Sequence, residues 1–151
     1  MYSSWGKWDK SRINIENALK IQMKLNNNLF EAMIRLDYAN LLNHLHETEH
    51  STEQIKEAGR LLKGLEDDRL LGISYGVMSN NYFTQGNYSE SIKFSKLAIG
   101  LFRKLGMSSY ESKLLTAIGD SYCKVGNFEK MKKSIDLALP ISEEFDDIFI
   151  Q

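Results

Sequence analysis

The stretch Ile118-Gly-Asp-Ser-Tyr-Cys-Lys-Val-Gly-Asn-Phe128 decides the fold class of this chain. It places a small residue, Gly119, three positions before Tyr122, and a second glycine, Gly126, two positions before an aromatic residue. Glycine adopts a positive φ easily and so can reverse the chain tightly between two helices. The aromatic side chain that follows begins the next helix, where it can fill the space between neighbours. The stretch therefore predicts two helices joined by a short turn.

The same pattern recurs at a fixed distance along the chain. Gly86 precedes Gly126 by 40 residues, and Gly6 precedes Gly86 by 80. An aromatic residue follows each glycine by two positions, and later positions keep the same offsets: Ala18, Ala98 and Ala138, then Leu25, Leu105 and Phe145. One helix pair cannot bury its apolar face alone, so repeated pairs must stack. Small residues at 39, 79 and 119 would let the stacked backbones approach closely.

The pattern of apolar residues predicts an all-α chain. Apolar residues recur at spacings of three and four, as in Leu114, Leu115 and Ile118, and there is no sustained alternation typical of strands. The chain has 1 proline, far fewer than the turns of an all-β protein would normally bring. Because Pro140 lacks a backbone N–H, we expect the last helix to kink or end near Leu139.

Composition excludes several classes of protein. The 19 basic and 20 acidic residues give a net charge of −1, which argues against a direct nucleic-acid partner. No apolar run approaches the roughly 20 residues that span a bilayer, so we expect no membrane partner. Cys123 is the single cysteine of the chain, which excludes an intramolecular disulfide and fits a reducing compartment. We therefore expect a cytoplasmic protein that uses no cofactor.

These residues resemble the tetratricopeptide repeat family. The family pattern is a small residue, a tyrosine three positions later, a glycine before an aromatic residue at the turn, and an alanine in the second helix. The usual period is about 34 residues, and the period seen in this chain resembles the longer variant of kinesin light chains, Pins-type scaffolds and bacterial peptide-sensing regulators. The resemblance implies a right-handed superhelix of antiparallel helix pairs, an α-solenoid of about seven helices.

The repeat offsets predict a single array over residues 1–151. We expect a lone second helix at 4–25 and helix pairs at 29–65, 68–105 and 108–145. The first of these pairs lacks a turn glycine, so its turn, around His46 to Ser51, should be about three residues longer than the others. Because the array begins within a repeat and shows no polar capping helix, we expect a fragment of a longer protein. The alternative is an open apolar end that forms a homodimer.

The resemblance also implies a peptide-binding groove lined by the first helix of each pair. An asparagine amide both donates and accepts hydrogen bonds, so it can pair with one peptide unit of an extended ligand, whereas a carboxylate such as Asp120 only accepts. The alternative is that these are ordinary solvent-exposed polar residues. The expected groove residues are Asn40, Asn43, Asn80, Phe83, Thr84, Lys113, Thr116, Asp120 and Lys124. The lysine run at 130–133 is interpreted as a solvated helix face.

A short zinc-protease pattern, His46-Glu47-Thr48-Glu49-His50, offers a different function. On a continuous helix, H-E-x-x-H places two imidazoles on one side for Zn²⁺, with the first glutamate as general base. Here the pattern falls at a predicted turn, and chance matches to it are common, so a solvated turn is the favoured interpretation.

We therefore expect a non-enzymatic module that binds a protein or peptide, including another domain of its own polypeptide. From the resemblance, we expect it to be the sensory or scaffolding part of a regulatory or signalling protein. The alternative is a zinc-binding hydrolase centred on residues 46–50.

Overall fold

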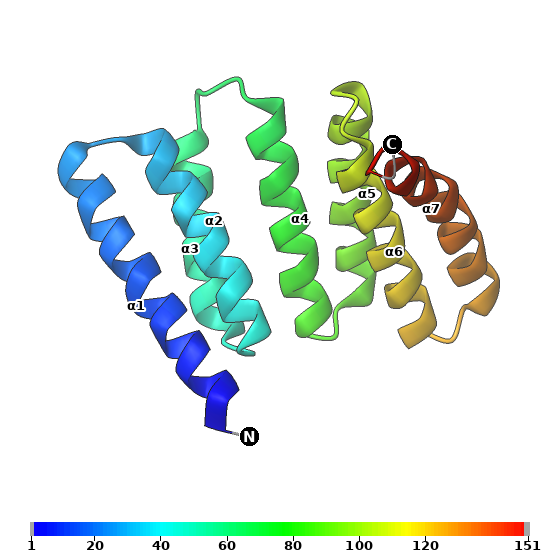
Figure 1. Cartoon of the computed structure of the whole chain (residues 1–151), viewed down its shortest axis with the longest axis horizontal. Coiled ribbons are helices and arrows are strands. Elements are labelled where there is room, and N and C mark those ends of the chain that lie inside the picture. The colour runs from blue at the N-terminus through cyan, green and yellow to red at the C-terminus, as the bar shows by residue number, and fades with distance from the viewer. Residues whose placement is uncertain (1, 150–151) are drawn as a thin grey trace. The chain divides into compact units, whose positions relative to one another are not determined.

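Helices account for all the regular structure in the computed structural model, which describes the backbone of residues 2–149 and the side chains of residues 7–142 (Figure 1). Within that part there are seven α-helices and no strand, as the periodicity predicts. They are α1 (Tyr2–Leu25), α2 (Asn28–His44), α3 (Thr48–Leu62), α4 (Asp68–Thr84), α5 (Tyr88–Lys104), α6 (Ser108–Lys124) and α7 (Phe128–Phe149). Side chains of residues 4–6 and 143–145, in the outermost expected repeats, lie outside the described residues. In the described part, no helix has the length and apolar character needed to cross a bilayer.

The helices divide into two compact units, one ending at Glu66 and the other beginning at Asp67. In the N-terminal unit, α2 packs against both α1 and α3. Ala39 is fully buried, and its carbonyl accepts a hydrogen bond of 3.0 Å from the Ser51 hydroxyl of α3. Small side chains at this crossing let the two helix backbones approach. The unit's fully or almost fully buried apolar residues are Ala32, Leu36, Ala39, Leu42 and Ala58.

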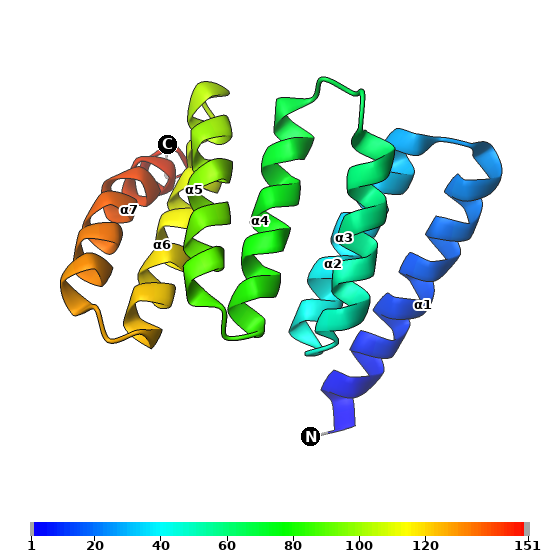
Figure 2. The ribbon, with the colours of Figure 1, turned by 180° about the vertical axis from the view of Figure 1, so that it is seen from behind.

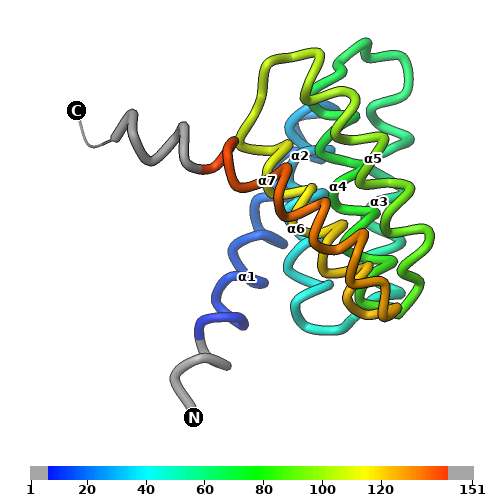
Figure 3. Tube along the Cα trace, turned by 90° about the vertical axis from the view of Figure 1, so that its right-hand side faces the viewer, coloured from blue at the N-terminus to red at the C-terminus, as the bar shows by residue number. Residues whose placement is uncertain are grey.

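In the C-terminal unit, α4 pairs with α5 and α6 pairs with α7, while α5 packs on α6 (Figures 2 and 3). The crossings again use small residues, as predicted. The Ser79 hydroxyl donates to the Ser91 carbonyl at 2.9 Å and lies 2.7 Å from the Ser95 hydroxyl. A Cβ placed on Gly119 would come within 3.2 Å of Ile135, so only glycine fits there without displacement. The close approach expected at 79 and 119 is confirmed.

Positive φ angles mark the turns at a regular spacing. Gly86, Gly106 and Gly126, with φ of 77°, 68° and 73°, lie 20 residues apart. At Gly126 the N–H donates to the Cys123 carbonyl, and the next N–H, of Asn127, donates to the Tyr122 carbonyl. This pattern of hydrogen bonds closes a helix C-terminus around a left-handed residue. Each helix with its turn thus occupies 20 residues, and a helix pair occupies the predicted period of 40.

One local expectation, the longer turn between α2 and α3, is wrong. His46 adopts φ 60° at the position of the missing glycine, so the turn between α2 and α3 is short, not extended by three residues. Gly6, which aligns with the turn glycines, lies inside α1. Helix α7 does not end near Leu139 but continues through Pro140. The carbonyl that loses its donor there belongs to Asp136, which is exposed and can bond to water instead.

Candidate functional site

A cavity of about 210 Å³ lies between α4 and α6 in the C-terminal unit. It brings together three of the predicted groove residues, Asn80, Phe83 and Asp120. Asn80 and Phe83 are half-buried on α4, whereas Asp120 is exposed on α6. The remaining residues of the α4–α6 cavity are small or apolar, namely Gly76, Ser79, Ser91, Leu114 and Ala117. A hollow with apolar walls and a few polar groups at its edge is the usual form of a site that holds one side chain of a ligand.

The polar groups of the α4–α6 cavity are held in place by the helices but left free at their tips. The Asn80 carbonyl accepts a hydrogen bond of 2.9 Å from the Thr84 hydroxyl, which fixes the backbone. Its side-chain amide makes no hydrogen bond within the described part of the chain, nor does the Asp120 carboxylate make an ion pair there. Phe83 is fixed by an edge contact with the ring of Tyr88 at 5.4 Å between centroids. These groups can therefore meet a ligand without breaking an internal contact.

Three other predicted residues, Lys113, Thr116 and Lys124, lie exposed on α6 and do not line the cavity. The Lys113 ammonium lies 5.8 Å from the centroid of the Tyr110 ring, and the Thr116 hydroxyl donates to the Ser112 carbonyl at 3.1 Å. They belong to the same unit as the cavity and form part of its solvated surface. Their role in binding stays a prediction.

Asn40 and Asn43, the predicted groove residues of α2, lie in the N-terminal unit. Asn40 is half-buried. Asn43 is only 2% exposed, and neither atom of its amide has a hydrogen-bond partner in the described structure. Asn43 follows Ala39 by four positions and so faces the same helix crossing, away from solvent. An amide buried in this way does not reach a ligand.

Leu114 and Ala117 line the cavity but were not predicted as site residues. The sequence presents Leu114 within an apolar stripe, and such a stripe normally indicates core packing. Leu114 packs beside the core of α5, α6 and α7, and because it is only partly buried it also lines the cavity. The sequence signal for this role is the glycine at position 76, which leaves space opposite Leu114. A Cβ at Gly76 would lie 3.7 Å from the Leu114 side chain.

The H-E-x-x-H pattern lies at the turn, with His46 and Glu47 before the start of α3. A hydrogen bond from His50 and a salt bridge of 2.6 Å with Arg12 lower the pKa of Glu47. The Arg12 guanidinium and the His50 ring engage both carboxylate oxygens, and the lowered pKa makes this group a weaker proton acceptor, which opposes a role as general base. In the described residues, no group of three or more His, Cys, Asp or Glu side chains is placed to hold a metal ion.

Comparison with solved structures adds independent evidence on the fold. The chain superposes on BtubC (BKLC) from P. vanneervenii with a TM-score of 0.77 and 20% identity, covering 96% of this chain and 60% of that one. It superposes on the TPR domain of Arabidopsis FLU with a TM-score of 0.68 and 21% identity, covering 75% and 95% of the two chains. The chain has a tetratricopeptide-repeat-like fold. It is an all-α, solenoid-like fold, as the resemblance of its repeats predicts.

A third similar structure is a signal transduction ATPase with numerous domains from Pyrococcus horikoshii, which carries a tetratricopeptide repeat sensor. Its TM-score is 0.75 at 20% identity, with 91% of this chain and 22% of that chain covered. This chain thus spans less than two thirds of the BtubC and P. horikoshii structures. No protein-family model matches the sequence. No curated protein matches it either.

Proposed function

We propose that this protein is a non-enzymatic module that binds a peptide segment on the face formed by α4 and α6. The observation that carries the proposal is the α4–α6 cavity, where an unpartnered amide, an aromatic ring and a carboxylate converge. The tetratricopeptide-repeat-like fold supports the proposal, because folds of this kind offer extended surfaces for protein interaction. The fold alone does not define a function, so the proposal rests on the cavity.

In this proposal, each group has a distinct role. The Asn80 amide donates to a carbonyl and accepts from an N–H of the same ligand peptide unit. Phe83 and Leu114 contact one apolar side chain of the ligand inside the cavity, where burial of apolar surface stabilises the complex. Asp120 accepts from a backbone N–H or from a cationic side chain of the ligand. Lys113, Thr84, Thr116 and Lys124, with Asn40 on the N-terminal unit, are proposed to extend the contact surface.

The biological setting that we propose is sensory or scaffolding work in a larger regulatory or signalling protein in the cytoplasm. The P. horikoshii protein, whose repeats act as its sensor, is an example of this arrangement in a similar fold. The bound segment then belongs to a partner protein or to another domain of the same polypeptide. Association of two copies through apolar helix faces at the ends of the array remains our alternative.

The test begins with a displayed library of random peptides panned against the purified chain. We expect enriched peptides that bind the wild type and whose affinity falls about tenfold in Asn80→Ala, since a hydrogen bond pair to a peptide unit contributes about 1 to 2 kcal/mol. Circular dichroism should show unchanged helicity, because Asn80 makes no side-chain bond to the rest of the described fold. Isothermal titration calorimetry measures the affinities.

Asn14→Ala is the matched control, because Asn14 is exposed on α1 in the other unit. It should leave the affinity unchanged. Failure to enrich any peptide would contradict the proposal, as would equal affinities of the wild type and Asn80→Ala.

A further inference from the structure

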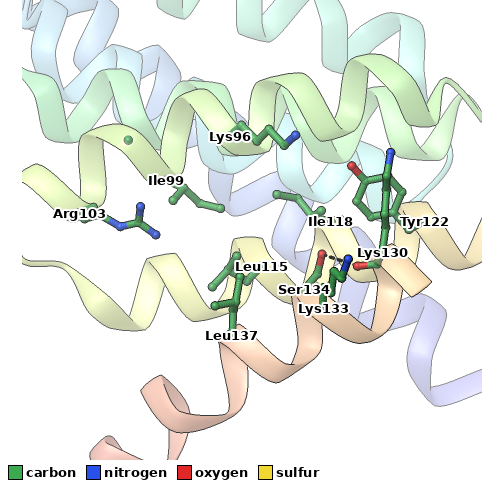
Figure 4. A pocket seen from close by; sticks show the side chains of 11 residues that line it. Lys96, Ile99, Arg103, Leu115, Ile118, Tyr122, Lys130, Lys133, Ser134 and Leu137 are labelled. Carbon is green, nitrogen blue, oxygen red and sulfur yellow. Dashed lines mark hydrogen bonds between the residues drawn. The ribbon is translucent and has the colours of Figure 1, made fainter. Parts of the chain in front are cut away.

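A second and larger hollow of about 420 Å³ opens on α5, α6 and α7 (Figure 4). Its walls are two helical stripes, Lys96, Ile99, Gly100 and Arg103 on α5, and Lys130, Lys133, Ser134 and Leu137 on α7. Each stripe follows the i, i+3, i+4, i+7 spacing, so each wall runs straight along two turns of its helix, about 10 Å. We call this feature the α5–α7 cleft. It contains none of the residues that line the α4–α6 cavity.

The floor of the α5–α7 cleft is apolar and belongs to α6. In the described structure, α6 packs against both α5 and α7, but the backbones of α5 and α7 do not approach each other closely. Leu115 and Ile118 of α6 therefore lie at the bottom of the cleft beside Ile99. On the rim, Leu137 is 61% exposed and so is accessible to an occupant of the cleft. An occupant seated here buries apolar surface on three sides.

The rim of the cleft carries four cationic side chains, of which two are paired with carboxylates. Arg103 pairs with Glu111, and Lys133 pairs with Glu129 at 2.7 Å. Lys96 makes no ion pair within the described residues, and the Lys130 ammonium lies 5.6 Å from the centroid of the Tyr122 ring, also without a carboxylate. Two unpaired ammonium groups thus stand beside an apolar floor in a chain whose net charge is −1. This charge distribution favours an anionic occupant.

We propose that the α5–α7 cleft binds an acidic amphipathic helix of a partner protein. A cleft with straight walls two turns long matches the apolar stripe of a helix laid along it, with side chains at i, i+3 or i+4, and i+7. Carboxylates beside that stripe meet Lys96 and Lys130. The partner is distinct from the peptide proposed for the α4–α6 cavity, because the two hollows use different faces of α6. The inference does not depend on that proposed function.

The probe is a synthetic peptide of about 14 residues, held helical by a side-chain lactam because short free helices are marginal in water. It carries leucines at i, i+4 and i+7 with glutamates on either side. A second peptide has lysine in place of every glutamate outside the lactam. Fluorescence anisotropy should show saturable binding of the acidic peptide alone, and added salt should weaken it.

The double variant Lys96→Glu, Lys130→Glu should raise the Kd of the acidic peptide by about tenfold or more. Lys132→Glu is the matched control, since Lys132 is an exposed lysine of α7 outside the cleft, and it should bind like the wild type. Asn80→Ala should also bind the acidic peptide normally, which separates this proposal from that of the α4–α6 cavity.

Several outcomes overturn the proposal. They are no saturable binding of the acidic peptide, equal binding of the lysine peptide, or equal losses in the double variant and in Lys132→Glu. Sedimentation velocity of the chain alone tests whether a second copy of the chain occupies the cleft instead. A dimer that the double variant abolishes would assign the cleft to a second copy, and would also overturn the proposal.

Discussion

At the scale of single residues, Asn43 is a polar side chain enclosed by the helix packing around it. Its amide is buried on α2 with no hydrogen-bond partner in the described structure. Burying an amide without a partner costs about 1 to 3 kcal/mol. A side chain of the same shape without polar atoms avoids this cost.

Asn43→Leu should therefore raise the free energy of unfolding by about 1 to 2 kcal/mol. Urea denaturation followed by circular dichroism measures the change. Asn40→Leu is a suitable comparison, because Asn40 is half-buried on the same helix and its replacement should change stability by less than about 0.5 kcal/mol. A destabilised Asn43→Leu would show that the amide is hydrogen-bonded in solution and that this account of the residue is wrong.

Residue chemistry also bears on the two functional hypotheses raised by the sequence. The zinc pattern needs a free glutamate between two histidines on one helix. Instead Glu47 pairs with Arg12 and His50, while His46 occupies the left-handed turn position. In the α4–α6 cavity, by contrast, the side-chain amide of Asn80 is unengaged and half-exposed. The geometry therefore favours binding over metal chemistry at the described residues.

At the scale of the element, one turn geometry repeats with different residues in the same position. Gly126 has φ 73° and His46 has φ 60°, although only the first is a residue that favours this conformation. A left-handed φ costs a residue with a side chain about 1 to 2 kcal/mol. Substitutions at the two equivalent positions should therefore have opposite effects.

Gly126→Val should lower the free energy of unfolding by about 1 to 3 kcal/mol, because a β-branched residue resists positive φ. His46→Gly should raise it by about 0.5 to 1 kcal/mol, since strain relief exceeds the added entropy of the unfolded chain. Thermal and urea unfolding test both variants. Effects of the same sign would refute the equivalence of the two turns.

The element scale also shows what the sequence could and could not predict. Recurring glycines, aromatic residues and small residues predicted the helix pairs and the crossings at Ser79 and Gly119, because these positions are constrained by the backbone itself. The turn at His46 was misjudged, since histidine is a much weaker signal for a left-handed φ than glycine. A kink or an end was expected near Pro140, and the helix does not end there, since an exposed carbonyl can bond to water when its helical donor is missing.

At the scale of the whole molecule, the repeat register predicts which residues share a face where the register alone decides their exposure. Asn80, Phe83 and Asp120 come together because equivalent positions on successive first helices share a face. Asn43 sits at the same register as Phe83 yet is buried, because local packing and not the repeat position determines its exposure. The α5–α7 cleft escaped sequence analysis entirely, because its lysines are indistinguishable from an ordinary solvated helix face until α7 is placed beside α6.

The account's central claim is that the face of α4 and α6 in this repeat fold is a peptide-binding surface. The most direct measurement is a ¹H–¹⁵N correlation spectrum of the labelled chain, titrated with a peptide selected by panning. The account predicts that shifted amides cluster at Asn80, Phe83, Leu114, Ala117 and Asp120. Shifts confined to the turn at residues 46–50 or to the α5–α7 cleft, or no saturable shifts at all, would contradict it.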